Sequence, residues 1–204
     1  MIEVEIKVLI LDPDRYRRMF MEQGGVYKAS FLHEDTYFNM PEGLRDFKTS
    51  DEALRIRQSV EFNKNNPKEK KTTHYLTYKG AKLDSSTKTR RELETKVEEG
   101  VITKEILILL GFREILTVKK ERELYEFIYN EKKVEVLIDY IPTLDHYFIE
   151  AEILAQGEEK VEENREILFN FLNQFNITKQ NSIRRSYLEL IIIELIKRGE
   201  FTLK

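Results

Sequence analysis

The first ten residues alternate between charged and apolar side chains. Glu3, Glu5 and Lys7 occupy odd positions, and the even positions from 2 to 8 are apolar. Because successive side chains of a strand point to opposite faces, this pattern predicts a strand over residues 1–10 with one apolar and one charged face. The charged face either contacts solvent, as in many half-exposed antiparallel sheets, or binds a ligand.

Seven later segments are also typical of strands, most of them with the same alternation. Helices do not follow them in a regular rhythm, so the pattern predicts an antiparallel sheet or barrel of the α+β class. The Lys-rich stretch 63–71 is predicted to be a polar, mobile loop between two of them. The strand segments are 34–40, 52–62, 73–81, 89–97, 115–129, 132–141 and 146–154.

Four segments show apolar stripes at helical spacing. Asp12 followed by Pro13 predicts the start of the first helix, and Thr103 and Ser182 are the predicted N-caps of the second and the last. The last helix contains "LELIIIELI", which is apolar around most of its circumference and indicates deep burial or a dimer contact. The helices are expected within residues 11–25, 103–111, 158–175 and 182–199, the first two between strands and the last two C-terminal to the strands.

The apolar stripes of these helices need a surface to cover. The apolar faces of the strands can supply that surface from outside a closed sheet, which turns the charged faces inward. We therefore expect one domain over residues 1–204, with a closed sheet over about 1–155 and helices packed on its outside.

The inward side chains would divide by sign. Burying so many charges costs several kcal/mol per unpaired ion, so the interior must hold water, a ligand or both. Arginine suits bidentate contacts with phosphate, and carboxylates two residues apart on a strand, with Cα atoms roughly 6.5–7 Å apart, can converge on Mg²⁺. The cations are Arg55, Arg57, Lys79, Lys120 and Arg122, and the anions are Glu3, Glu5, Asp139, Glu150 and Glu152.

Composition excludes several classes of function. The net charge of −3 gives no electrostatic reason to expect nucleic acid, and the absence of cysteine excludes thiol chemistry. The apolar stretches are too short to span a bilayer, and charge at Glu3 leaves no signal peptide, so we expect a cytoplasmic protein without membrane contact. His33, His74 and His146 are not at ligand spacing and are predicted to be surface or loop residues.

Several motifs resemble those of the CYTH superfamily, the triphosphate tunnel enzymes. "EVEIK" at residues 3–7 matches its E-x-E-x-K signature. The segment 33–58 is similar to the class IV adenylyl cyclase branch of that superfamily. The other motifs follow in the expected order, namely "LRIR", "TYKG", "RRELET", "KKER", "LIDY", "IEAEI" and "SYLELI".

The resemblance implies a closed eight-stranded antiparallel barrel that binds a triphosphate together with Mg²⁺ or Mn²⁺. It also implies a homodimer, since related cyclases are dimeric. It assigns Glu5, Lys7 and Asp139 to catalysis. By motif position the metal ligands are Glu3, Glu5 and Glu152 with Glu150 close by, and the phosphate-binding residues are Lys7, Arg55, Arg57, Lys79, Lys120 and Arg122.

Three activities are compatible with these residues. An adenylyl cyclase would convert ATP to cyclic AMP and pyrophosphate, and it is the one we favour. A triphosphatase would hydrolyse tripolyphosphate, thiamine triphosphate or a nucleotide with the same residues. A binding module would hold a triphosphate with little turnover.

Overall fold

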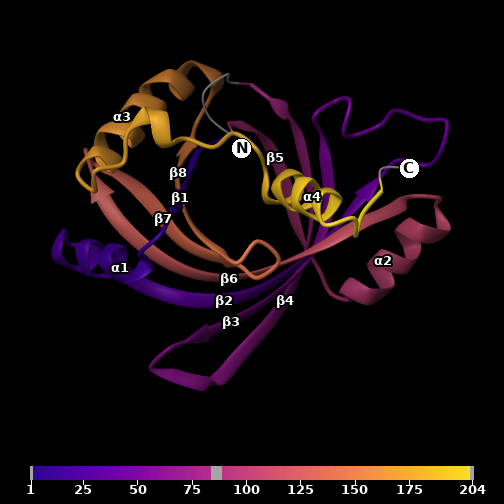
Figure 1. Cartoon of the computed structure of the whole chain (residues 1–204), viewed down its shortest axis with the longest axis horizontal. Helices are drawn as coiled ribbons and strands as arrows, with labels where there is room; N and C mark the ends of the chain where they lie inside the picture. The colour runs from indigo at the N-terminus through magenta and orange to yellow at the C-terminus, as the bar shows by residue number, and fades with distance from the viewer. Residues whose placement is uncertain (1, 84–88, 203–204) are drawn as a thin grey trace.

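The computed structural model describes residues 2–83 and 89–202, so Met1, which the first predicted strand includes, lies outside the described residues. Eight antiparallel strands form a closed barrel in the order β1-β5-β4-β3-β2-β6-β7-β8 (Figure 1). This confirms the predicted eight-stranded α+β barrel. The strands are β1 (Ile2–Ile10), β2 (Val26–Asn39), β3 (Ala53–Asn63), β4 (Asn66–Lys82), β5 (Arg90–Val97), β6 (Arg113–Tyr129), β7 (Lys132–Ile141) and β8 (His146–Ala155).

Two strand predictions need correction. β2 begins at Val26, well before the predicted segment at 34–40, and it pairs along almost its whole length with β6. The predicted loop at 63–71 is wrong, because β3 and β4 continue as a hairpin joined only by residues 64–65. Opposite charges face each other across this hairpin, where Glu61 pairs with Lys71, and such cross-strand pairs stabilise a polar ladder.

The helices are α1 (Pro13–Glu22), α2 (Gly100–Leu109), α3 (Val161–Asn173) and α4 (Tyr187–Lys197), with 3-10 turns at Glu158–Lys160 and Lys179–Asn181. Asp12 caps α1 as predicted, since its carboxylate accepts a hydrogen bond from the Arg15 amide at 2.9 Å. The other two predicted caps are wrong. Thr103 lies inside α2, and Ser186, not Ser182, caps α4.

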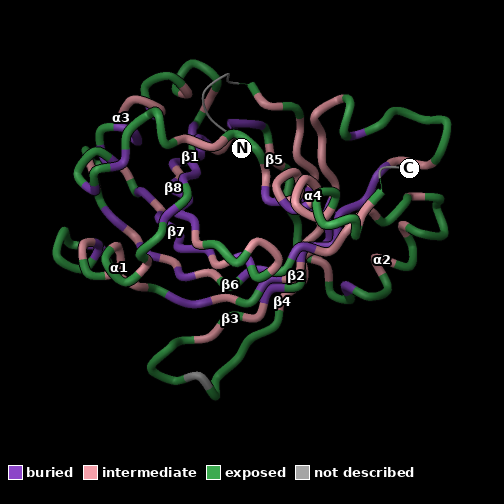
Figure 2. Tube along the Cα trace, viewed as in Figure 1, coloured by how far each residue is buried: buried purple, intermediate pink, exposed green. Residues whose placement is uncertain are grey.

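The main apolar core lies between the outside of the barrel and the helices α1 and α3. The even-numbered residues of β1, from Val4 to Ile10, are buried there with outward residues of β7 and β8. Phe20 of α1 and Phe171 of α3 pack into the same cluster. Figure 2 shows this buried layer where α3 covers β1 and β8. The apolar faces of the strands therefore point out of the barrel and the charged faces point into its lumen, as predicted.

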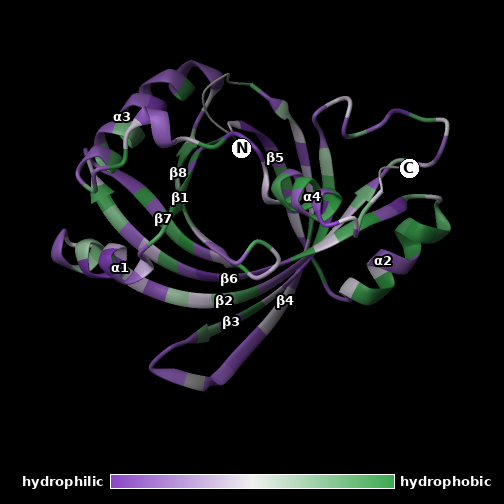
Figure 3. Cartoon of the chain, viewed as in Figure 1, coloured by the Kyte–Doolittle hydropathy of each residue, from purple (hydrophilic) through white to green (hydrophobic). Residues whose placement is uncertain are grey.

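Helix α4 departs from this arrangement because it faces the lumen. β1 pairs with β5 only at Ile2 and Glu3, which leaves a gap further along the edge of β1. The segment before α4 fills this gap, where Ser182 bridges Val8 and the Ile183 amide donates to the Lys7 carbonyl at 2.7 Å. The apolar α4 that follows, visible in Figure 3, packs against lumen side chains such as Phe148.

None of the helices in the described part of the chain has the length and apolar character needed to cross a membrane.

Candidate active site

The lumen has an acidic arc and a basic arc on opposite walls. We define the acidic arc as the inward carboxylates of three neighbouring strands and the basic arc as the inward cations of the strands facing them. The order of the strands creates this division, because β8, β1 and β5 are adjacent, as are β4, β3, β2 and β6. The acidic arc is Glu150 and Glu152 on β8, Glu3 and Glu5 on β1, and Glu92 and Glu94 on β5; the basic arc is Lys79 on β4, Arg55 and Arg57 on β3, and Lys120 and Arg122 on β6.

Both arcs line one cavity of about 1120 Å³. All of the predicted site residues except Lys7 and Asp139 are among its lining residues. Lys7 is fully buried, with its Nζ 4.0 Å from the centre of the Tyr187 ring. Asp139 is also fully buried and is covered by hydrogen bonds from Arg122 and Tyr187. These two residues therefore support the cavity wall and do not face the cavity directly.

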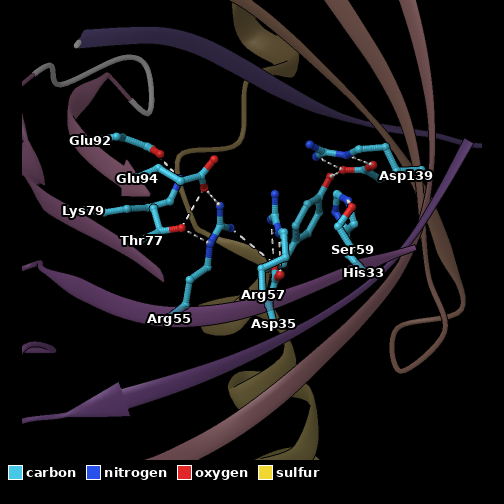
Figure 4. Close-up of polar contacts among 12 residues, drawn as sticks. His33, Asp35, Arg55, Arg57, Ser59, Thr77, Lys79, Glu92, Glu94 and Asp139 are labelled. Atoms are coloured by element: carbon cyan, nitrogen blue, oxygen red, sulfur yellow. Dashed lines mark hydrogen bonds and ion pairs between the residues drawn. The ribbon is translucent and has the colours of Figure 1, made fainter. Parts of the chain in front are cut away.

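Asp35 of β2 holds the two arginines of β3 in place (Figure 4). Its carboxylate accepts two hydrogen bonds from Arg57, at 2.6 and 2.8 Å, and one from Arg55 at 3.2 Å. Burial alone would raise the pKa of Asp35, but the charges of Arg57 and Arg55 hold it well below the usual value. Asp35 is thus an anion that fixes two cations side by side on the basic arc.

A second network fixes Arg122 at the edge of the basic arc. Its guanidinium donates to both carboxylate oxygens of Asp139 at 2.6 Å and to Glu150 at 2.5 Å. The hydroxyl of Tyr187 donates to Asp139 at 2.9 Å, so the first residue of α4 joins this network. Burial tends to lower the pKa of Arg122, but Asp139 and Glu150 hold it well above the usual value. α4 is therefore tied to the phosphate-binding candidates.

The two arcs meet at the boundary of β4 and β5. Lys79 forms an ion pair with Glu92, and the Thr77 hydroxyl donates to Glu94 at 2.7 Å while it accepts from Arg55 at 3.3 Å. Figure 4 shows these side chains pointing toward one another from β3, β4 and β5. These contacts keep the cations extended toward the lumen.

The neighbouring carboxylates of the acidic arc repel one another. Glu5 lies directly opposite Glu152 across β1 and β8, and Glu3 is two residues along the same face. Burial and then the charge of Glu92 raise the pKa of Glu3 to about 7, and burial followed by Glu3 and Glu5 raises the pKa of Glu152 well above its usual value. Within residues 2–83 and 89–202, no three acidic or histidine side chains are close enough to hold an ion as they stand. The donors nevertheless suit a hard divalent cation, because they are oxygen ligands whose mutual repulsion a cation would relieve.

Lys120 on β6 and His33 on β2 are cross-strand neighbours. Burial, and next the charge of Arg122, lowers the pKa of Lys120 to about 7. Burial and then Arg57 lower the pKa of His33 far below its usual value, so its ring is neutral, with Nε2 3.0 Å from the Ser59 hydroxyl. The prediction that His33 is a surface or loop residue is wrong, because the side chain is buried.

The other two histidines lie away from the arcs. His146 is exposed at the start of β8, as predicted. His74 is half-buried in β4 and packs so closely on the start of α2 that a Cβ at Gly100 would lie 2.5 Å from its ring.

Asp35 and Tyr187 belong to the site but were not predicted from the sequence. The inward position of Asp35 could have been predicted from the sequence, because Asp35 shares a strand face with Tyr37 in the predicted segment 34–40. Tyr187 had no comparable signal, because its position depends on α4 entering the lumen.

A closed barrel whose lumen sets carboxylates against arginines and lysines defines a class of protein that binds polyanions together with a cation. The chain belongs to the CYTH family, whose domain matches residues 1–187. This family binds triphosphate substrates, consists generally of enzymes and is typically metal-dependent. The match confirms the resemblance that the motifs indicated.

Individual relatives agree with this assignment. A Methanocaldococcus jannaschii protein provisionally named an adenylate cyclase is 37% identical over 191 residues, which cover 93% of this chain and 98% of the relative. The structure of a Pyrococcus horikoshii protein is similar with a TM-score of 0.79 and 33% identity, over 94% of this chain and 99% of that one. A Hippeastrum protein, provisionally named an adenylyl cyclase and described as having a dominant triphosphatase activity, shares the fold with a TM-score of 0.58 and 16% identity, over 98% and 97% of the chains.

Proposed function

We propose that this protein is a divalent-metal-dependent adenylyl cyclase that converts ATP to cyclic AMP and pyrophosphate. The observation that carries the proposal is the acidic arc facing the basic arc across one cavity. The name of the Methanocaldococcus jannaschii relative, at 37% identity, supports the same activity. The basic arc matches a triphosphate, and the acidic arc matches the cation that a triphosphate brings with it.

The basic arc would bind and orient the leaving group. When the ribose 3′-oxygen bonds to the α-phosphorus, the bond from that phosphorus to the β-phosphate oxygen breaks and pyrophosphate carries the charge away. Arg55 and Arg57, fixed by Asp35, offer paired donors to those oxygens. We assign acceptance of the hydroxyl proton to Glu5, which lies between the other carboxylates of the acidic arc.

The metal would be held by carboxylates of the acidic arc. Glu3, Glu5 and Glu152 are the proposed ligands, with Glu150 beside them. When bound, Mg²⁺ or Mn²⁺ supplies charge neutralisation at the phosphates and acidifies the ribose hydroxyl. Lys7 would act through its place beneath Tyr187, as a fixed positive charge behind the cavity wall.

Product analysis tests the proposal. The protein is incubated with ATP and Mn²⁺ or Mg²⁺, and the products are separated by ion-exchange chromatography. Cyclic AMP and pyrophosphate in equal amounts are expected. Formation of ADP and orthophosphate would show that the protein is a triphosphatase and not a cyclase. Binding of the triphosphate without any product would indicate a binding module. Glu61→Gln, an exposed change on β3 outside the cavity, is the matched control for Glu5→Gln.

A further inference from the structure

The basic arc ends at a neutral pair of side chains, His33 of β2 and Ser59 of β3. Along β3 the inward positions are Arg55, Arg57 and Ser59, and each step of two residues covers roughly 6.5–7 Å. Ser59 lies opposite His33 across the two strands, and the Nε2 atom of His33 is 3.0 Å from the Ser59 hydroxyl. The first two inward positions therefore carry cations, whereas the third brings together a hydroxyl and an imidazole.

Residues that line the cavity flank His33 on both sides. Lys120 lies directly opposite it on β6, and Arg57 is one inward step along β3 from Ser59. In the view of Figure 4, His33 and Ser59 lie between Arg57 and Asp139. The imidazole is thus placed where one end of a polyanion bound along the basic arc would lie.

The second ring nitrogen of His33 lacks a partner. Its Nδ1 atom is buried and has no hydrogen-bond partner within residues 2–83 and 89–202. The whole residue is only 6% exposed. Because almost all buried polar atoms of a folded protein are hydrogen-bonded, this nitrogen calls for a partner that the described chain does not supply.

The ring is neutral because it lies among cations. Burial and then the charge of Arg57, followed by those of Lys120 and Arg122, lower the pKa of His33 far below its usual value. A neutral imidazole carries one hydrogen, which either nitrogen can hold. When the Ser59 hydroxyl donates to Nε2, the hydrogen is on Nδ1, which then becomes a donor. The anion that the surrounding cations attract supplies the matching acceptor.

We propose that His33 is a further triphosphate-binding residue, which donates a hydrogen bond from Nδ1 to a phosphate oxygen at the end of the basic arc. The inference rests on the proposed function, since it needs a triphosphate in the arc, but it is the same for cyclisation and for hydrolysis. A neutral donor contacts the phosphate without adding a charge to the cations around it. Ser59 is the positioning residue, because its hydroxyl fixes the hydrogen on Nδ1.

Two amide substitutions separate the two ring nitrogens. In His33→Asn the amide nitrogen is bonded to Cγ, as Nδ1 is, so a donor remains there while the contact with Ser59 is lost. In His33→Gln the amide reaches the position of Nε2, so that contact is kept while Nδ1 is lost. In calorimetry with tripolyphosphate and Mg²⁺, His33→Gln should weaken binding roughly 10- to 150-fold, the range for a hydrogen bond to a charged group. His33→Asn should bind with nearly the affinity of the wild type.

Nitrogen NMR of the wild type, with isotope-labelled histidine, gives a second readout. The spectra distinguish a ring nitrogen that carries hydrogen from one that does not. When tripolyphosphate and Mg²⁺ are added, Nδ1 of His33 should carry the hydrogen and its signal should shift. His146→Gln is the control, because it changes an exposed histidine that does not line the cavity and should leave the affinity unaltered.

The outcomes keep this test separate from the proposed function. A His33 signal that does not change at saturating tripolyphosphate would overturn the inference alone, as would His33→Gln binding as tightly as the wild type. Equal losses of affinity in His33→Asn and His33→Gln would also overturn it, since the ring would then act through its packing. If a variant does not fold, the NMR result on the wild type decides. A wild type that does not bind tripolyphosphate would overturn the proposed function and the inference with it.

Discussion

Asp35 offers a direct test of how the basic arc is held together. Its carboxylate is 1% exposed and neutralises two arginines at distances of 2.6 to 3.2 Å. Asp35→Asn keeps the shape of the side chain but leaves Arg55 and Arg57 without their buried counter-charge. Breaking one partner of a buried ion pair costs roughly 3–5 kcal/mol. At about 2–4 °C per kcal/mol for a chain of this size, the melting temperature should fall by roughly 6–20 °C.

A triphosphate should reverse much of this loss. Its oxygens can take the place of the missing carboxylate, so the variant gains more from the ligand than the wild type does. A ligand present at a hundred times its dissociation constant stabilises a protein by about 2.7 kcal/mol. The wild type is expected to gain about this amount from tripolyphosphate with Mg²⁺, and Asp35→Asn to gain more at the same concentration.

Thermal unfolding with and without tripolyphosphate measures both effects. Glu123→Gln is the matched control, because Glu123 is also a buried carboxylate with two cationic partners, Arg17 and Lys64, but does not line the cavity. It should lose stability without any enhanced response to the ligand. If Asp35→Asn shows the same ligand-induced shift as the wild type or a smaller one, Asp35 does not hold the arginines for an anion.

Three further outcomes follow from the site. Because burial lowers the pKa of Lys120 to about 7, anion binding should raise that pKa and take up a proton at pH 8, so affinity should fall as the pH rises above 7. Calorimetry in two buffers of different ionisation enthalpy detects the proton uptake. If the uptake persists in Lys120→Met, a group other than Lys120 takes up the proton. Glu5→Gln should abolish metal-dependent product formation without lowering the melting temperature, since it relieves repulsion in the acidic arc; wild-type turnover would remove Glu5 from the site. Arg57→Ala should weaken tripolyphosphate binding by about 1.5–3 kcal/mol, roughly 10- to 150-fold by calorimetry, and unchanged affinity would contradict its role as a phosphate donor.

The strands and their two faces could be predicted because the alternation has a period of two and repeats in most of the strands. The inward direction of Glu3, Arg57 and Glu152 follows from that parity once the apolar faces are assigned to the helices. Ser186 as the N-cap of α4 could also have been predicted, because Glu189 three residues later completes a capping box that Ser182 lacks.

What could not be predicted depends on which strands are neighbours. β2 lies between β3, the next strand in the chain, and β6, which is far from it in sequence. This order brings Asp35 beside Arg57 and His33 beside Lys120. The position of α4 depends in the same way on the short pairing of β1 with β5. An apolar helix has no local feature that distinguishes the inside of a barrel from its outside.

The segment that fills the gap beside β1 has a consequence for how the protein is made. Residues 182–196 leave the ribosome after all eight strands, so a growing chain can form its sheet while one edge of β1 still lacks a neighbour. Exposed strand edges attract other chains, and this edge is covered only when synthesis reaches Ser182. Truncation before that residue should therefore yield an inactive product that aggregates. The nascent protein should acquire the ability to bind its ligand late in synthesis.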